Sequence, residues 1–237
     1  MEKVGTKWQK DSSWGDFYIT TLKEYGNQVD LKNALINSDN IYFAKVALKV
    51  GNSKMEEQLT NIGFGQDLEL GQNVSNSTYG QNGKISSEGQ LANTGYGQGQ
   101  VLVNPIHMAS VYSAFLNEGN MVKPYLEKQD NKPVEYLKQG VFSKEAADII
   151  KEALIQVVEN EKGTAHSAKI SGKTIGGKTG TAEIKTSKQD ENGTEIGWFN
   201  AFIDDANNPL LVISMVEDVK GRGGSHYLLP KIKAVFQ

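Results

Sequence analysis

The sequence of 237 residues contains no cysteine and only three histidines, His107, His166 and His226. Without cysteine there are no disulfides, no thiolate metal sites and no cysteine nucleophile. The histidines are scattered without the spacing of metal ligands, so we expect neither a metal site nor a cofactor. A Ser-His-Asp triad is not indicated either, because no serine stands in a G-x-S-x-G nucleophile elbow.

Long apolar runs and an excess of charge of one sign are also missing. Charged residues make up 22% of the chain and the formal net charge is −3, which gives no electrostatic reason to bind nucleic acid or an anionic membrane. No apolar stretch approaches the ~20 residues that cross a bilayer, and no signal-peptide core follows Met1. We expect a soluble chain that forms one domain over residues 1–237.

What the sequence does contain is a lysine flanked by glycines, Lys178, in the segment GGKTGTAE at 176–183. Glycine has no Cβ, so the main chain on both sides of Lys178 can approach a bound molecule closely. The pair Asn192-Gly193 and the alternating apolar residues after it predict a hairpin. We therefore expect Lys178 to lie on a strand that contacts a ligand.

The same stretch has a competing interpretation as a phosphate-binding loop. Residues 172–179 match G-x-x-x-x-G-K-T, and the apolar run 210–216 ends in Glu217-Asp218, as an acidic Mg²⁺-binding strand would. Such a loop follows a buried strand and opens a helix. Here a polar segment precedes the motif and no helical apolar stripe follows it. Nucleotide binding therefore remains a remote alternative.

Lys178-Thr179-Gly180 also belongs to the set S-x-x-K, S-D-N and K-T-G of serine acyl-transfer enzymes. Ser38-Asp39-Asn40 supplies S-D-N in the required order. Together with the segment GYGQG at 95–99 and Asn104-Pro105, these motifs resemble the transpeptidase domain of penicillin-binding proteins. The flanks at 8–15 and 30–41 are most similar to class B enzymes of the low-affinity, methicillin-resistance type of Gram-positive bacteria, and the resemblance spans nearly the whole chain.

Periodicity and capping residues, together with this resemblance, predict an α+β fold in which helices cover an antiparallel sheet, as in β-lactamases and D,D-transpeptidases. Short connections require antiparallel neighbours among the strands. Residues 63–93 are rich in Gly, Asn, Ser and Gln, and we expect a long surface loop with Tyr79 exposed. The resemblance implies that this region borders the substrate cleft, which makes Tyr79 also a candidate lining residue. Helices are predicted at 31–36, 41–50, 54–62, 105–118, 144–158 and 227–236, and strands at 173–184, 194–204 and 210–218.

The S-D-N segment has a second interpretation as a helix cap, since Ser, Asp and Asn are favoured N-cap residues. The presence of Lys178-Thr179-Gly180 makes us favour an active site, and Asp39 can serve both roles. By the resemblance, Ser38 relays a proton to the leaving amine and Asn40 holds the acyl-side amide. Lys178 supplies positive potential beside Ser38. These three residues are the candidate catalytic residues.

The resemblance implies that the neighbours of Lys178 bind substrate. Thr179 would bond the carboxylate of a D-alanyl terminus or of a β-lactam, and Gly180 would let the substrate lie along the strand edge. The backbone N–H of Thr181 would be one oxyanion donor. The implied partners are peptidoglycan stem peptides and β-lactam antibiotics.

The nucleophilic element S-x-x-K is not found in these residues, because no serine stands three positions before a lysine. Thr20-x-x-Lys23 has the spacing, but it lies in an extended-looking stretch. The resemblance implies that the attacking serine, the first strands and a membrane anchor lie upstream of Met1. We therefore expect an N-terminally truncated fold, inactive alone, from a parent protein on the extracellular face of the cytoplasmic membrane.

Two further functions stay open within the same fold. A serine β-lactamase needs a general base for deacylation, for which Glu69 and Glu88 are candidates although neither lies in a matching motif. A non-catalytic β-lactam sensor would bind the drug without cross-linking peptides. The measurements that separate these functions are nitrocefin turnover and cell-wall cross-linking.

Overall fold

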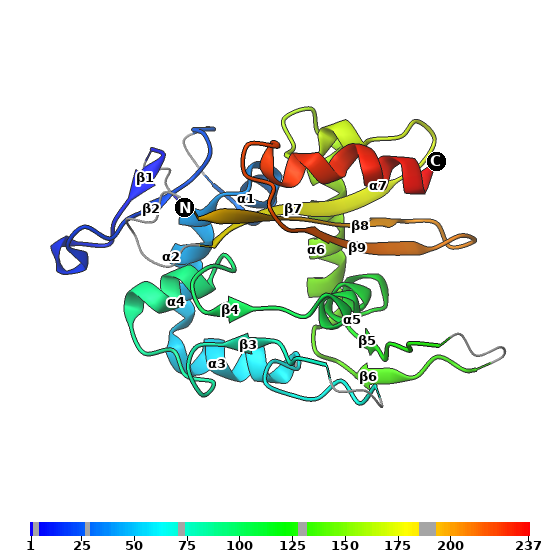
Figure 1. Cartoon of the computed structure of the whole chain (residues 1–237), viewed down its shortest axis with the longest axis horizontal. Coiled ribbons are helices and arrows are strands. Elements are labelled where there is room, and N and C mark those ends of the chain that lie inside the picture. The colour runs from blue at the N-terminus through cyan, green and yellow to red at the C-terminus, as the bar shows by residue number, and fades with distance from the viewer. Residues whose placement is uncertain (2–4, 27–28, 71–73, 128–131, 185–192) are drawn as a thin grey trace.

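A three-stranded antiparallel sheet forms the centre of the fold (Figure 1). The computed structural model describes residues 1–237 except 2–4, 27–28, 71–73, 128–131 and 185–192. The sheet has the order β7-β8-β9 and agrees with the predicted strands to within two residues at each end. The predicted Asn192-Gly193 turn lies partly outside the described residues. The strands are β7 (Ile175–Ile184), β8 (Thr194–Ile203) and β9 (Leu210–Val216).

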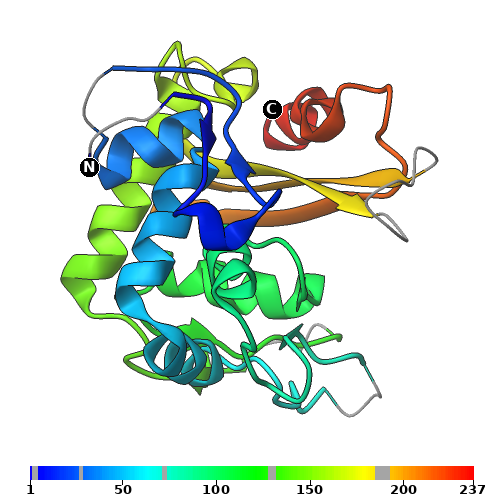
Figure 2. The same ribbon diagram turned by 90° about the vertical axis from the view of Figure 1, so that its left-hand side faces the viewer.

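Helices cover both faces of this sheet, so the predicted α+β architecture is confirmed. The C-terminal helix α7 covers one face and α5 packs on the other (Figures 1 and 2), while α6 contributes side chains to the apolar clusters of both faces. Short two-stranded ribbons join β1 to β2, β3 to β4 and β5 to β6. The helices are α1 (Leu31–Asn37), α2 (Asn40–Val50), α3 (Asn52–Asn61), α4 (Glu88–Thr94), α5 (Pro105–Leu116), α6 (Lys144–Glu159) and α7 (Leu229–Phe236), and the ribbon strands are β1 (Lys7–Trp8), β2 (Ile19–Thr20), β3 (Thr78–Tyr79), β4 (Val101–Leu102), β5 (Met121–Val122) and β6 (Tyr136–Lys138).

Alternation along β8 explains how one sheet supports two apolar layers. Successive side chains of a strand point to opposite faces. Phe199 and Ala201 are fully buried in the cluster that contains Leu229 of α7. Phe202 points the other way and packs with Tyr112 of α5 in a separate cluster. Both faces of the central strand are therefore buried, which makes it a rigid support for the neighbouring strand β7.

Local capping chemistry sets the helix ends, as the sequence predicted. Asp30, Asn104 and Ser143 each accept a backbone N–H at the start of α1, α5 and α6. Each such cap satisfies one of the backbone donors that a helix leaves unpaired. The predicted closing helix is shorter than expected, because residues 224–228 form a 3₁₀ turn before α7 begins.

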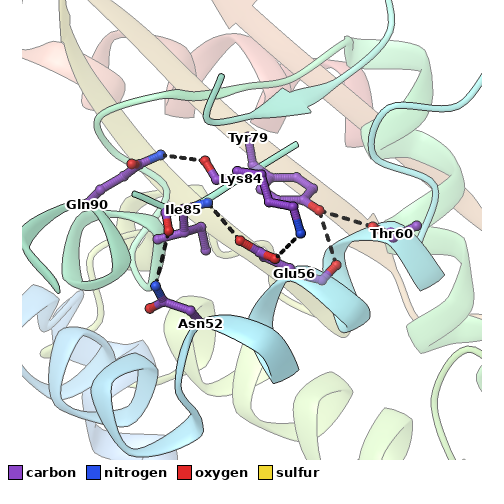
Figure 3. A network of polar contacts seen from close by, with 7 residues as sticks. All are labelled: Asn52, Glu56, Thr60, Tyr79, Lys84, Ile85 and Gln90. Atoms are coloured by element: carbon purple, nitrogen blue, oxygen red, sulfur yellow. Dashed lines mark hydrogen bonds and ion pairs between the residues drawn. The ribbon is translucent and has the colours of Figure 1, made fainter. Parts of the chain in front are cut away.

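The described residues of 63–87 are mostly irregular, as the predicted surface loop requires, but the expected exposure of Tyr79 and the extension of the loop to residue 93 are wrong. Strand β3 and helix α4 lie within this segment, and Tyr79 is 5% exposed and packs against Phe64 rather than lying in solvent. Figure 3 shows the reason: the Glu56 carboxylate of α3 accepts bonds from Lys84 Nζ at 3.0 Å and from the backbone N–H of Ile85 at 2.8 Å. This polar network holds the segment against α3, a contact that local sequence patterns do not reveal.

Candidate active site

The S-D-N and K-T-G motifs meet at one point of the structure. Lys178 Nζ donates a hydrogen bond of 2.8 Å to Ser38 Oγ. Lys178 lies on β7, and Ser38 lies in the bend between α1 and α2, 140 residues away in the sequence. Two separate motifs of the predicted set therefore form one site at the junction of the sheet and the helices.

Ser38 has an unusual backbone conformation. It is the C-cap of α1 and lies in the left-handed region, with φ 53° and ψ 57°. Its backbone N–H still bonds carbonyl groups of α1, while the next residue, Asp39, already caps α2. A non-glycine residue in this region carries strain of about 1–2 kcal/mol. The two helix ends hold Ser38 in place and direct its hydroxyl to Lys178.

Asp39 connects this bend to the N-terminal segment. It is 1% exposed, and its Oδ1 accepts the backbone N–H groups of Ile41 and Tyr42 at 3.0 and 3.2 Å. The hydroxyl of Tyr25 donates to Asp39 Oδ2 at 2.6 Å. The predicted capping role of Asp39 is thus confirmed. Burial, followed by the hydrogen bond to Asp39, raises the pKa of Tyr25, so its hydroxyl stays protonated as a donor.

The third S-D-N residue also contacts the N-terminal segment. Asn40 Nδ2 donates to the carbonyl oxygen of Thr20 at 3.1 Å. The contacts of Thr20 and Tyr25 with the motif were not expected from sequence, because they join the short strand β2 and the irregular residues after it to a helix end. Only the aromatic and apolar character of residues 17–25 could have suggested that this segment packs on the bend.

Lys178 lies in a poorly hydrated position. Burial lowers its pKa from 10.5 to about 8, because desolvation disfavours the charged form of an amine. Its ammonium group also donates to the carbonyl oxygen of Thr179 at 2.8 Å. Lys178 therefore combines a positive charge with a pKa close enough to neutrality for proton exchange.

One edge of β7 has no strand beside it among the described residues. Backbone groups of successive strand residues point to opposite edges. Asp204 N–H bonds the carbonyl of Thr174, which shows that even-numbered residues of this run point toward β8. Thr179 and Thr181 consequently direct their N–H and C=O groups to the open edge. Side chains reach both carbonyls: Lys178 bonds that of Thr179, and Gln98 bonds that of Thr181.

The side chains of the two threonines contact the protein rather than open space. Thr179 is 6% exposed, and its hydroxyl donates to Thr164 Oγ1 at 2.8 Å. The hydroxyl oxygen of Thr181 accepts the backbone N–H of Ser225 at 3.1 Å. These bonds tie β7 to the loop after α6 and to the turn before α7, which fixes the position of its open edge. The contact of Thr164 with Thr179 was not predicted.

The glycines around Lys178 differ in how strongly the fold requires them. A Cβ on Gly176 would come within 2.2 Å of the Phe202 ring, and one on Gly177 within 2.7 Å of the Asn200 carbonyl oxygen. A Cβ on Gly180 would meet only Trp198 Cβ, at an ordinary 3.6 Å. Packing therefore demands glycine at 176 and 177 but leaves Gly180 to be explained by something outside the described protein atoms.

The phosphate-loop interpretation finds no structural basis. Lys178 lies within the ten-residue strand β7, and no helix follows the G-K-T sequence, so the phosphate-loop interpretation is wrong. Glu69 pairs with Lys123, and Glu88 pairs with Lys10, both at exposed positions. The described residues contain no group of three or more metal-ligating side chains.

Comparison with known proteins agrees with the geometry of the site. The family model described as "Penicillin binding protein transpeptidase domain" matches residues 1–237. The chain belongs to this family. Among curated relatives of this transpeptidase domain, "Penicillin-binding protein 3" of Bacillus subtilis is 46% identical over 233 residues, covering 98% of this chain and 35% of the relative. "Probable peptidoglycan D,D-transpeptidase PbpC" of Pseudomonas aeruginosa is 32% identical over 194 residues, covering 82% and 33%.

A solved structure confirms the fold of the transpeptidase domain. The apo structure of the TP domain from Burkholderia pseudomallei penicillin-binding protein 3 superposes with a TM-score of 0.79 at 23% identity. It covers 94% of this chain and 66% of the solved one. The domain spans about a third of the length of the curated relatives that it matches. Among its described residues, no helix is both long and apolar enough to cross a membrane.

Proposed function

We propose that this chain forms the supporting half of the acyl-transfer site of a peptidoglycan D,D-transpeptidase. Such an enzyme cross-links stem peptides through a serine acyl-enzyme and is blocked by β-lactams. The proposal is carried by one observation, the 2.8 Å hydrogen bond from Lys178 Nζ to Ser38 Oγ. It joins a hydroxyl to a cation on a strand, β7, one edge of which has no strand beside it among the described residues.

In this proposal Ser38 and Lys178 form the proton path to the leaving group. Because Ser38 Oγ accepts the Lys178 bond, its own hydrogen is available to the amine of a bound peptide. As the scissile C–N bond breaks, the Ser38 hydroxyl gives its proton to the amine nitrogen and takes one from the Lys178 ammonium. A pKa near 8 suits this exchange, since proton carriers work best near the operating pH.

Substrate recognition is assigned to the open edge of β7. An extended peptide adds to such an edge through main-chain hydrogen bonds. The Thr181 N–H is one oxyanion donor, and Lys178 attracts the terminal carboxylate. Thr179 bonds this carboxylate after its hydroxyl exchanges the bond to Thr164. Gly180 leaves room for the substrate, which accounts for a glycine that packing does not demand. Asn40 holds the acyl-side amide after exchanging its bond to the Thr20 carbonyl.

We further propose that the attacking serine belongs to a segment outside these 237 residues, because the S-x-x-K pattern does not occur in them. The parent protein would then act at the outer face of the cytoplasmic membrane. The flanking sequences at 8–15 and 30–41 support the low-affinity, methicillin-resistance type.

Fluorescent penicillin tests this proposal. A longer natural protein that contains this chain should be labelled covalently, and the label should be lost in its Ser38→Ala and Lys178→Met variants. The isolated chain should remain unlabelled. Loss of peptide cross-linking on deletion of the gene separates a transpeptidase from a sensor, and negligible nitrocefin turnover separates it from a β-lactamase. Covalent labelling of the isolated chain would refute the external nucleophile.

A further inference from the structure

A glutamine from a distant loop contacts the strand that we assign to substrate binding. Gln98 Nε2 donates to the carbonyl oxygen of Thr181 at 3.2 Å, across 83 residues of sequence. Thr181 directs its N–H and C=O groups to the open edge of β7, because the even-numbered residues of this strand pair with β8. The Gln98 amide therefore occupies a backbone acceptor of that edge.

The loop that carries Gln98 is well anchored at the end of α4. Gly97 and Gly99 have φ values of 77° and 75°, a conformation that glycine adopts without strain. The backbone N–H of Gln98 donates to the Asn93 carbonyl at 3.0 Å, and the Tyr96 hydroxyl donates to Asn93 Oδ1 at 2.5 Å. These bonds hold the backbone of Gln98 in place, so that its side chain can contact β7.

A peptide that pairs with the β7 edge needs the acceptor that Gln98 occupies. In an antiparallel pair, a hydrogen-bonded residue uses both its N–H and its C=O. The N–H of Thr181 is open to the incoming chain, but its carbonyl already accepts a bond. Binding at this register therefore exchanges the Gln98 amide for a substrate N–H.

We propose that Gln98 is a positioning residue that caps the substrate edge of β7 and competes with the main chain of the incoming peptide. This inference rests on the proposed function, because it requires substrate to add to β7. The competition acts on the first, non-covalent step. It leaves the proton path through Ser38 and Lys178 unchanged.

The residue Gln100 provides a matched control in the same loop. Its side-chain oxygen accepts a bond from Gln90 Nε2 of helix α4 at 3.3 Å. Gln98 and Gln100 have the same chemistry and are two positions apart. Only the first bonds the strand in the described contacts, so only its removal should change the binding of substrate.

The test uses the longer protein with fluorescent penicillin, measuring the dissociation constant of the initial complex separately from the acylation rate constant. Removing a neutral hydrogen bond that binding must break should lower this dissociation constant roughly twofold to tenfold in Gln98→Ala. Gln98→Leu, which keeps the bulk but cannot donate, should also bind more tightly. Both variants should keep the wild-type acylation rate constant and melting temperature, and Gln100→Ala should match wild type throughout.

The possible outcomes separate this inference from the function on which it rests. An unchanged or weaker initial complex in both Gln98 variants overturns the competition. A fall in the acylation rate constant with unchanged binding also overturns it, because that result assigns Gln98 a role in loop rigidity alone. If the wild-type protein is not acylated at all, the proposed function fails and the inference fails with it.

Discussion

Lys178 Nζ lies 2.8 Å from Ser38 Oγ, although the two residues belong to different structural layers. The lysine is held by the buried sheet and the serine by two helix caps. Neither side chain needs to rearrange for the contact to form. Strand β7 and the helices α1 and α2 therefore set the positions of both groups. Substitutions at Lys178 or Ser38 should change the chemistry of the site without unfolding these elements.

Replacing Lys178 with methionine should stabilise the fold while abolishing acylation of the longer protein. The folded-state pKa of about 8 lies below the value of 10.5 for an exposed lysine. Keeping this amine charged costs the folded state roughly 2–4 kcal/mol below pH 8. Methionine has similar length and no charge, but it loses the bonds to Ser38 and Thr179, so we expect a net gain of about 1 kcal/mol at pH 7.

The pH dependence identifies the cause of that gain. Between pH 8 and 10.5 the unfolded chain binds the lysine proton more strongly than the folded one, so the wild type becomes more stable as pH rises. The advantage of Lys178→Met should shrink over this range. Urea unfolding of both proteins at pH 7 and pH 9.5 measures it, and an advantage that is constant with pH would contradict the desolvation argument.

Substitutions at Ser38 should separate backbone strain from hydroxyl chemistry. Both Ser38→Gly and Ser38→Ala remove the hydroxyl, and both should reduce acylation of the longer protein at least a hundredfold, the cost typical of losing one catalytic proton donor. They differ in the left-handed conformation at φ 53°. Both variants lose the bond from Lys178, so both should be less stable than wild type. Glycine also relieves the strain and should therefore be about 1 kcal/mol more stable than alanine.

Thermal unfolding of these two variants measures the strain directly. Equal melting temperatures would mean that the bend relaxes around alanine, and the argument from strain would fail. Labelling that persists in either variant would instead remove Ser38 from the proton path. Melting temperature and labelling are independent measurements, so the backbone strain at Ser38 and its role in proton transfer are tested separately.

Sequence reasoning succeeded where the signal is local. The caps of α1, α2 and α6 could be predicted because Asp30, Asp39 and Ser143 bond backbone groups two or three residues away. The strands could be predicted from alternation and short connections. The contact between Ser38 and Lys178 was predicted from the order of the S-D-N and K-T-G motifs. Local sequence patterns alone could not predict it, because it depends on the resemblance to a known family.

Contacts between segments that are distant in the sequence were not predicted. Tyr79 looked exposed because its neighbours are polar, yet its burial depends on Phe64 and on the bond between Glu56 and Ile85. The bonds from Tyr25 to Asp39 and from Gln98 to Thr181 leave no periodic trace in the sequence. Each depends on tertiary placement, which single-residue preferences do not encode.

Alanine substitutions at two glycines should show opposite effects. Gly176→Ala would force a Cβ to within 2.2 Å of the Phe202 ring and should destabilise the protein by about 1–3 kcal/mol. Gly180→Ala meets only Trp198 Cβ at 3.6 Å, so stability should change by less than about 0.5 kcal/mol. Acylation of the longer Gly180→Ala protein should nevertheless fall about tenfold, a barrier increase of about 1.4 kcal/mol.

Urea unfolding and labelling with fluorescent penicillin together test this contrast. Gly176→Ala serves as the control for a packing effect in the same strand. If Gly180→Ala acylates at the wild-type rate, the substrate does not approach this residue closely. A large loss of stability in Gly180→Ala would instead mean that the fold requires glycine there.

The buried His107 should make stability depend on pH. Its Nδ1 lies 2.7 Å from Ser77 Oγ and its Nε2 lies 2.7 Å from the Ile62 carbonyl, so Nε2 donates and Nδ1 accepts in the neutral ring. Burial lowers the pKa of His107 below 6.5. As pH falls through 6.5, the unfolded chain takes up this proton before the folded one does, and stability is lost.

His107→Gln isolates this contribution, because glutamine keeps a donor for the Ile62 carbonyl but does not titrate. At pH 7.5 the variant should be less stable by about 1–2 kcal/mol, since it loses the bond to Ser77 and part of the packing. Toward pH 5 the difference should shrink, because only the wild type is then penalised by protonation of its unfolded state. Urea unfolding from pH 5 to 7.5 measures this, with the exposed His226→Gln as a control that should follow the wild type. A difference that does not change with pH would mean that the ring is protonated equally in both states, which contradicts its burial between the Ser77 hydroxyl and the Ile62 carbonyl.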